Sequence, residues 1–307
     1  MTDKKQNHRS AHSVDWFEKH FKLITLMPAI LFFLILTVAP TIELIRMAGQ
    51  HISFVDREMV RVPALIDNFQ HFLSDRIYRA VLLNTIIFVF SSTVLELLFG
   101  FALALLVSEI VRARNVVRTL CLLPILMPQV AIGNMWRLMY DPDFGVIGNF
   151  ILTQIGIGAY ALLGDPATAL AAVVAVDVWH WTPFVFIILL AGIESLPQDV
   201  LEASRADGAS YWQRLRFIVI PLMWPALLVA FIFRSIFAFK VFDQIFLLTS
   251  GGPGLKTEVL SLHVYKVYFQ QHQLGYGAFI ALVTIAIIIA YLGVMMLVQR
   301  RLKKATQ

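Results

Sequence analysis

Six stretches of this 307-residue chain are long and apolar enough to cross a lipid bilayer, and this pattern constrains the fold more than any other feature. A helix that spans a bilayer needs about 20 mostly apolar residues. No Asp, Glu, Lys, Arg or His interrupts the six stretches except Glu96, Asp177 and His180. The sequence therefore predicts an all-α, polytopic membrane protein with six transmembrane helices. The stretches are 23–42, 80–108, 119–136, 168–191, 217–233 and 273–299.

The composition argues against the main alternatives to a membrane protein. Hydrophobic residues make up 59% of the chain and charged residues 15%, against roughly 45–50% and 25% in an average soluble domain. A disordered chain would need low hydrophobicity and high net charge. One or two soluble cores of this size could not bury so much apolar surface. The single cysteine, Cys121, allows no intramolecular disulfide and does not identify the redox compartment.

The basic residues predict how the chain is oriented. Short cytoplasmic segments of membrane proteins carry an excess of Lys and Arg. The first 22 residues, the second–third and fourth–fifth connections and the C-terminal tail together hold 15 of the 25 basic residues. Both termini are therefore expected in the cytoplasm, with tails at 1–22 and 300–307 and one six-span domain over 23–299. Membrane insertion then explains the net charge of +5, and no nucleic-acid partner is expected.

A cleaved signal peptide is the alternative interpretation of the first apolar stretch. Such a peptide has an apolar region of about 7–15 residues followed by a small-residue cleavage site. The stretch over 23–42 is longer, and its only small-residue site ends at Ala39 and is followed by Pro40. We therefore expect this stretch to remain as a transmembrane helix.

No catalytic motif is present in the sequence. The segment Gly251–Thr257 has the look of a phosphate-binding loop, but that loop needs Gly before its Lys, and Leu255 stands there. Hydrolase elbow, zinc-protease and paired C-x-x-C motifs do not occur. His8 and His12 are four residues apart in a polar tail and are not expected to bind a metal. The sequence predicts no catalytic site, no metal site and no cofactor in this chain.

The most informative hydrophilic segment, residues 193–216, joins the fourth and fifth apolar stretches on the predicted cytoplasmic side. It begins as a short polar helix that Gly208 can end, because glycine tolerates the left-handed conformation of a helix stop. A second helical stretch follows. The small side chains of Ala203 and Ser204 would let a partner approach closely. An ordinary interhelical loop is the alternative interpretation.

This segment resembles the EAA motif of permease subunits in binding-protein-dependent ABC importers. The motif reads Glu-Ala-Ala, three residues, Gly, nine residues, then Ile-x-Leu-Pro. Ser204 and Ile220 depart from it, with Ser for Ala and Ile for Leu. The matching positions are Glu202, Ala203, Gly208, Ile218 and Pro221. The resemblance implies that the segment couples the chain to an ATPase. The residues to which it assigns that role are Glu202, Ala203, Ser204, Asp207 and Gly208.

Further motifs extend the resemblance over nearly the whole chain from about residue 25. Residues 136–145, 242–253, 257–261 and 275–278 are similar to the first permease subunit of carbohydrate importers of the maltose and glycerol-phosphate type. The resemblance implies a multi-pass subunit in the lipid of the bacterial cytoplasmic (inner) membrane that imports a sugar or sugar-like solute. It also implies the partners: a second permease subunit, two ATPase subunits that hold ATP and Mg²⁺, and a periplasmic or lipid-anchored solute-binding protein.

Candidate substrate contacts lie in the fourth and fifth apolar stretches. A sugar site needs polar groups for hydroxyls and flat rings for the apolar face of the sugar. The fourth stretch offers both on one helical face, at positions i, i+3, i+4 and i+7. These positions are Asp177, His180, Trp181 and Phe184. The resemblance adds Arg234 and Val241 from the part of the chain that follows residue 217.

A purely structural interpretation of these groups is also open, since charged side chains inside a membrane often pair with one another. Asp177 could hold Arg234 in an ion pair. Counting the helical rise places Arg234 nearer the outer surface than Asp177, which favours a cavity role for Asp177. Glu96 is expected to make a structural or inter-subunit polar contact.

Other functions are compatible with the same sequence features. An importer of this kind could carry a non-carbohydrate solute. An ion-coupled secondary transporter could use the intramembrane acids as ion ligands, whereas an integral membrane enzyme would need a catalytic set that the sequence lacks. Within the carbohydrate interpretation, the sequence does not distinguish a neutral sugar, a polyol, a sulfonated sugar and a glycerol phosphate.

Overall fold

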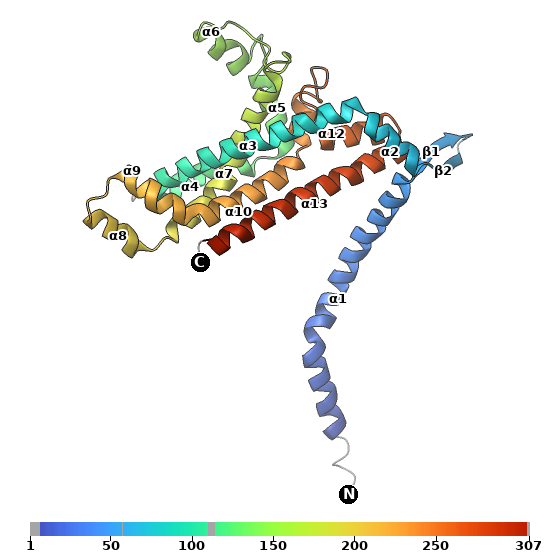
Figure 1. The fold of residues 1–307 in the computed structure, drawn as a ribbon, viewed down its shortest axis with the longest axis horizontal. Coiled ribbons are helices and arrows are strands. Elements are labelled where there is room, and N and C mark those ends of the chain that lie inside the picture. The colour runs from blue at the N-terminus through green and yellow to red at the C-terminus, as the bar shows by residue number, and fades with distance from the viewer. Residues whose placement is uncertain (1–6, 57, 110–113, 306–307) are drawn as a thin grey trace.

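The computed structural model describes residues 7–56, 58–109 and 114–305. Its centre is a bundle of long helices in which α3, α7, α10 and α13 run alongside one another (Figure 1). In chain order, the α-helices and strands are α1 (Asn7–Ala48), β1 (Gln50–Val55), β2 (Glu58–Pro63), α2 (Leu65–Ser74), α3 (Arg76–Ser108), α4 (Arg114–Leu122), α5 (Gln129–Met139), α6 (Leu152–Gln154), α7 (Ala169–Glu194), α8 (Gln198–Ala206), α9 (Tyr211–Arg214), α10 (Ile220–Phe239), α11 (Asp243–Leu248), α12 (Leu260–Tyr265) and α13 (Leu274–Ala305). A 3₁₀ helix at Pro124–Leu126 and π-helical segments at Val146–Ile151, Leu215–Val219 and Lys266–Gln270 lie between them.

In the part of the chain that the structure describes, five helices are long and apolar enough to cross a membrane. They correspond to five of the six predicted stretches. The observed helices extend beyond the apolar stretches where a local signal allows it. For example, α3 begins at Arg76 because the side chain of Asp75 accepts hydrogen bonds from the N–H groups of Ile77 and Tyr78, at 2.9 and 3.0 Å. The five helices are Thr25–Ala48, Arg76–Ser108, Ala169–Glu194, Tyr211–Phe239 and Leu274–Arg301.

The third predicted stretch, 119–136, is not one helix. It is divided among α4, a 3₁₀ turn at Pro124–Leu126 and α5. Proline lacks the backbone N–H that a continuing helix needs, and Pro124 and Pro128 both lie in this region. Met127 has the extended conformation (ψ 137°) that is favoured before a proline. The prediction of a continuous third helix is therefore wrong, and a sixth membrane crossing stays a prediction.

A second difference from the expected all-α fold lies between α1 and α2. Strands β1 and β2 form an antiparallel hairpin in which Gln50 lies opposite Pro63 and Val55 opposite Glu58. Asp56 adopts a positive φ of 50° in the turn. Because β2 is exposed along its whole length, no buried face imposes an alternating pattern on its sequence. Elsewhere in the described residues the regular structure is helical.

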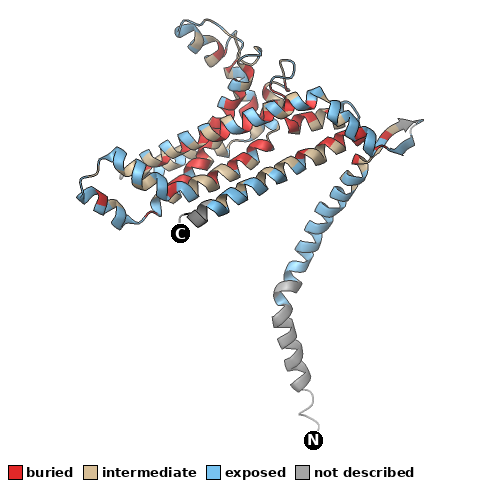
Figure 2. Ribbon diagram, in the orientation of Figure 1, coloured by how far each residue is buried: buried red, intermediate tan, exposed pale blue. Residues whose placement is uncertain are grey.

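Burial differs strongly among the long helices. Helix α7 packs against α3 and α10, and 67% of its most apolar stretch is buried, against 11% in the spans that contain α10 and α13. None of the corresponding stretch of α1 is buried, and Figure 2 shows this part of α1 in pale blue over most of its length. Helix α7 therefore forms the centre of the core, and lipid or another protein must cover the apolar surface of α1.

Three of the four segments whose charges predict the cytoplasmic side gather at one end of the bundle, whereas the start of α1 lies away from that end (Figure 1). The end of α3, the start of α4, α8, α9 and the end of α13 all lie there (Figure 1). Lys4, Lys5 and Arg112, which contribute to the same prediction, lie outside the described residues. The cytoplasmic location of the two termini stays a prediction.

Candidate functional site

The candidate site is built around three buried charged groups from α3, α7 and α10. Arg234 Nη2 lies 2.8 Å from Glu96 Oε1 and also donates to Asp177 Oδ2, while Arg234 Nε pairs with Glu96 Oε2. All three side chains are at most 1% exposed. Charged groups inside a membrane are costly unless they are paired. These three residues, the central ion pairs, therefore neutralise much of their charge within the chain.

The side chains of Asp177 and Arg234 meet, although counting the helical rise placed Arg234 nearer the outer surface than Asp177. That count took residue 168 as the membrane surface. Helix α7 has 26 residues, or about 39 Å, and so exceeds a hydrocarbon core of roughly 30 Å. Counted from the other end, Asp177 is 17 residues from Glu194, and Arg234 is 17 residues from Phe217.

Glu96 makes the structural contact that was one of its two expected roles. It is 0% exposed, and both of its carboxylate oxygens face Arg234. A residue so enclosed offers no surface to another subunit. The inter-subunit alternative for Glu96 is therefore wrong.

His180, one turn along α7 from Asp177, connects the beginnings of two short helices. The side-chain nitrogens of Gln129 in α5 and Gln244 in α11 each lie 3.3 Å from His180 Nδ1. An amide nitrogen only donates, so Nδ1 is the acceptor, its single lone pair is shared between the two amides, and the ring proton lies on Nε2. His180 and Gln244 are 3% and 2% exposed. The neutral imidazole therefore holds α5 and α11 against α7.

A cavity of about 150 Å³, here called the central cavity, lies beside these groups. Three of the predicted substrate residues line it: Asp177, Trp181 and Val241. Ligand pockets usually measure about 300–1,000 Å³, so the central cavity is smaller than a usual ligand pocket. The remaining lining residues are Gln129, Phe237, Lys240, Phe242, Asp243 and Gln244.

The central cavity combines aromatic and polar surfaces. Trp181 stacks on Phe237 with ring centroids 5.2 Å apart and planes 17° apart. Arg234 Cζ lies 5.1 Å from the Trp181 ring, where a cation–π contact helps to fix the indole. Lys240 and Asp243 are exposed residues of the lining and bring one charge of each sign. The arrangement can hydrogen-bond hydroxyl groups and pack against an apolar ring face.

The other predicted substrate residues do not line this cavity. His180 lies behind it, in contact with the lining residues Gln129 and Gln244. Phe184 packs edge-on against Trp181 and Phe237, with centroids 5.9 Å apart in each case. Arg234 is buried in the central ion pairs. The predicted face of α7 is therefore divided between residues that reach the cavity and residues that support it.

Two polar lining residues, Gln129 and Gln244, were missed in the sequence. Both carry a signal that could have identified them, since each lies within two residues of the start of a helix that follows an interruption. Irregular backbone at membrane depth is tolerated where it lines a cavity or is buried in protein. A polar residue just after such an interruption is therefore a reasonable candidate for a cavity wall.

The predicted coupling segment forms a second, exposed region at the end of the bundle. Helix α8 ends at Ala206, and Gly208 takes a positive φ of 76°, which confirms the predicted helix stop. The N–H groups of Gly208 and Ala209 donate to the carbonyls of Arg205 and Ser204, at 3.0 Å in each case. A capping box between Ser210 and Gln213 then starts α9.

Only part of the predicted coupling set faces outward. Glu202, Ala203, Asp207 and Gly208 are exposed. Ser204 is only 7% exposed, and its Oγ donates to the carbonyl of Leu201 at 2.7 Å. Ser204 therefore packs toward the bundle, so its expected place among the small residues open to a partner is wrong.

The loop that follows α11 is fixed by a polar cluster of its own. Glu258 Oε1 lies 2.7 Å from His263 Nδ1, and Glu258 Oε2 lies 2.5 Å from Lys266 Nζ. Asn84 of α3 donates to the backbone oxygens of Leu255 and Glu258. Burial acts to raise the pKa of Glu258, but hydrogen bonds from His263 and Lys266 outweigh it and hold the pKa below its ordinary value.

The central cavity and the coupling segment both lie in a part of the chain that is similar to known proteins. Residues 96–304 match the family described as "Binding-protein-dependent transport system inner membrane component". The trehalose/maltose transport system permease protein MalF of Thermococcus litoralis is 38% identical over 224 residues, which cover 73% of this chain and 75% of that protein. The sulfoquinovosyl glycerol transport system permease protein SmoG of Agrobacterium fabrum is 27% identical over 289 residues, covering 93% and 92% of the two chains.

A solved structure shares the fold. It is a chain of the bacterial alginate ABC transporter in complex with an alginate pentasaccharide-bound periplasmic protein. The TM-score is 0.82 and the sequence identity 23%, with 94% of this chain and 98% of that chain covered. The overall helical arrangement of this chain is thus one that a solved transporter chain also adopts.

Proposed function

The chain belongs to the family of binding-protein-dependent transport system inner membrane components, and we propose that it carries a sugar or sugar-like solute across the bacterial cytoplasmic membrane. In this proposal it is one permease subunit of an ABC importer. The names of two relatives, a trehalose/maltose permease and a sulfoquinovosyl glycerol permease, support the class of solute.

The observation that carries the solute proposal is the chemistry of the central cavity. The amide oxygens of Gln129 and Gln244 are buried and have no hydrogen-bond partner among the described residues. Leaving such groups unpaired costs about 1–3 kcal/mol each, so a solute hydroxyl that donates to them would bind favourably. Trp181 supplies a flat surface for a sugar ring, and Asp177 supplies a further acceptor. Arg234 acts by fixing Asp177 and Trp181, without touching the solute.

The partners that we propose follow from two features of this chain, the small size of the central cavity and the exposed coupling segment. The central cavity is too small to enclose a sugar, so a second permease subunit completes it. The exposed residues of α8 and of the turn that follows it, Glu202, Ala203, Asp207 and Gly208, form the surface that meets an ATPase subunit. ATP and Mg²⁺ are assigned to two such subunits. A soluble binding protein delivers the solute at the opposite end of the bundle.

Reconstitution into liposomes tests this assignment. The chain alone should show no uptake with ATP on either side. Together with its second permease, ATPase and binding protein, it should take up solute only when ATP is present on the ATPase side. Uptake by the single purified chain in an ion gradient would overturn the proposal and favour an ion-coupled transporter.

The solute class has its own test. Calorimetry on the binding protein encoded with this permease should show tight binding of a sugar, polyol, sulfonated sugar or glycerol phosphate. Tight binding of an amino acid or peptide, with no binding of carbohydrate, would contradict the carbohydrate assignment while leaving the importer assignment intact.

A further inference from the structure

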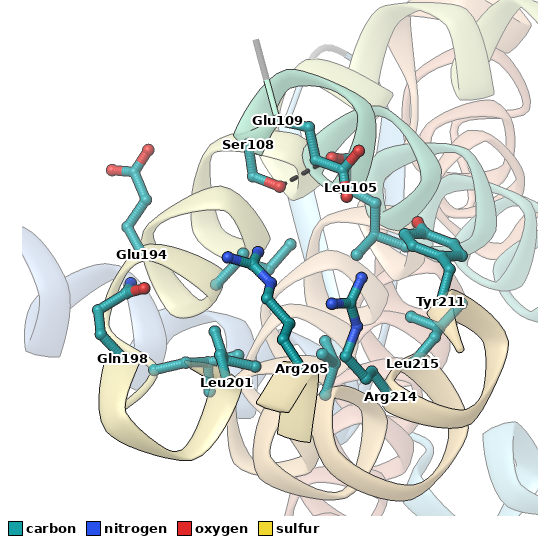
Figure 3. Close-up of a pocket in the computed structure, with 13 residues that line it drawn as sticks. Leu105, Ser108, Glu109, Glu194, Gln198, Leu201, Arg205, Tyr211, Arg214 and Leu215 are labelled. Carbon is teal, nitrogen blue, oxygen red and sulfur yellow. Dashed lines mark hydrogen bonds between the residues drawn. The ribbon is translucent and has the colours of Figure 1, made fainter. Parts of the chain in front are cut away.

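A second and larger pocket, here called the end pocket, lies at the end of the bundle that carries α8 and α9. Its volume is about 820 Å³, and it is an open pocket bounded by the ends of α3 and α7, by α8, and by α9 with the π-helical segment Leu215–Val219 that follows it (Figure 3). Apolar side chains form much of its wall. They include Leu105, Leu201, Leu215 and Val219. No residue of the end pocket lines the central cavity.

Two arginines project into the end pocket. Arg205 comes from α8 and Arg214 from α9, and Figure 3 shows both guanidinium groups turned toward its interior. Neither forms an ion pair with the described residues. Of the two carboxylates at the pocket, that of Glu194 is paired with Arg118, which leaves two guanidinium groups facing the single carboxylate of Glu109. The end pocket therefore has an excess of positive charge.

Aromatic residues beside the end pocket are of the kind that gathers at the boundary between membrane and water. Tyr211 lines the pocket, and Trp212 and Phe217 follow in the same helical run with 74% and 70% of their surface exposed. Tyrosine and tryptophan gather where a helix passes from water into lipid. From Phe217 onward the run carries no charged residue until Arg234. This order is the one expected where charged groups face lipid headgroups and an apolar wall faces the acyl chains.

The face of α8 that lines the end pocket is not the face that carries the exposed Ala203. Gln198, Leu201 and Arg205 have the spacing of one helical face and line the pocket. Ala203 lies on the opposite side of the helix and is exposed. A protein bound to the outer side of α8 therefore leaves the end pocket on the side of the bundle.

We propose that the end pocket binds an anionic phospholipid. The guanidinium groups of Arg205 and Arg214 hold its phosphate, which planar guanidinium groups recognise with paired hydrogen bonds. Its acyl chains cover Leu105, Leu215 and Val219, and burial of this apolar wall adds to the affinity. A free phosphate would meet the same two arginines but would leave the apolar wall uncovered.

Native mass spectrometry of the full-length chain, in the assembly in which it is purified, tests the proposal. The protein is placed in nanodiscs containing equal amounts of phosphatidylglycerol and phosphatidylcholine and then released with its retained lipid. We expect phosphatidylglycerol to be retained on the order of tenfold over phosphatidylcholine, and millimolar inorganic phosphate to leave it in place. Equal retention of the two lipids, or displacement by inorganic phosphate, would overturn the proposal.

A pair of double variants localises the site. Arg205→Gln with Arg214→Gln should abolish the preference for phosphatidylglycerol. The matched control, Arg216→Gln with Arg301→Gln, removes the same charge from residues that do not line the pocket and should keep the preference. Preference that survives in the first variant, or that is lost equally in both, would show that general surface charge and not the end pocket selects the lipid. Equal retention of the two lipids by the unmodified chain would overturn the proposal even if a variant does not fold.

Discussion

The central cavity and the end pocket handle charge in opposite ways. Beside the central cavity, Arg234 lies between Glu96 and Asp177, and all three side chains are at most 1% exposed. At the end pocket, Arg205 and Arg214 have no ion-pair partner among the described residues. The membrane interior offers neither water nor counter-ions, so the chain must neutralise charge there itself. At the boundary between membrane and water, water and counter-ions are available. Charged side chains there can stay without an ion pair inside the chain and can bind a partner protein or a lipid.

Removing the cation from the central ion pairs should have the largest effect. Arg234→Met leaves Glu96 and Asp177 buried together without their common partner, and loss of one member of a buried ion pair costs about 3–5 kcal/mol. We expect a steep fall in the unfolding temperature of the detergent-solubilised protein. Adding Glu96→Gln and Asp177→Asn should recover most of the loss, because the triple variant has no uncompensated charge. A single variant as stable as the parent would show that these pairs do not hold the bundle together.

The next largest effect should be on transport through the central cavity. Trp181→Ala removes the ring that stacks on Phe237. Aromatic contact and burial are worth on the order of 1–3 kcal/mol, so apparent affinity or rate of uptake should fall about five- to a hundredfold. Trp181→Phe keeps a flat ring and should retain most of the uptake. Assembly with the ATPase should be unchanged in both. Normal transport by Trp181→Ala and by Asp177→Asn would place the solute path along another face.

At the end of the bundle, Gly208→Val should disturb coupling. No atom lies within 4 Å of the position that a Cβ would take, so there is room for the side chain. The effect comes from the φ of 76°, which a β-branched residue adopts only with strain of about 1–3 kcal/mol. We expect weaker co-purification of the ATPase and less solute-stimulated ATP hydrolysis. Gly208→Asn, which tolerates this conformation better, is the control. Full stimulation in the valine variant would contradict the assignment of α8 to the ATPase.

The smallest effect should appear only in acid, at the loop after α11. The pKa of Glu258 is lowered in the folded protein, so its contribution to stability is present above the unfolded pKa of about 4.3. That contribution is lost as the pH falls through the lower folded pKa. The unfolding temperature of the parent should therefore drop below about pH 4 more than that of Glu258→Gln. Parallel pH profiles for the two proteins would show that the contacts with His263 and Lys266 add no pH-dependent stability.

The elements that sequence could identify are those governed by local rules. Apolar length is enough to place α1, α3, α7, α10 and α13. The helix stop at Gly208 follows from the backbone freedom of glycine, and the structure confirms it. The resemblance to importer permeases depends on short motifs and is confirmed by the family match over 96–304.

The features that sequence missed depend on three-dimensional packing. Whether Asp177 meets Arg234 depends on how far each helix extends beyond the membrane, which a hydropathy pattern does not define. Ser204 and Ala203 are adjacent and similar in size, yet one is buried and the other exposed, because only one of them points toward the bundle. The break between α4 and α5 could have been predicted from Pro124 and Pro128, whereas the contact of Gln129 with His180 required the fold.

The broken segment between α4 and α5 also bears on how the chain is made. When residues 119–136 leave the ribosome they form an uncharged apolar stretch, and α7 and α11, which pack against this segment, have not yet been synthesised. The backbone groups freed by Pro124 and Pro128 and the amide of Gln129 would then face lipid without their later partners. We therefore expect this stretch to enter the bilayer in a provisional form and to reach its final shape only after translation has delivered α11. The wall of the central cavity can then form only after α11 has been synthesised, although part of that wall lies much earlier in the chain.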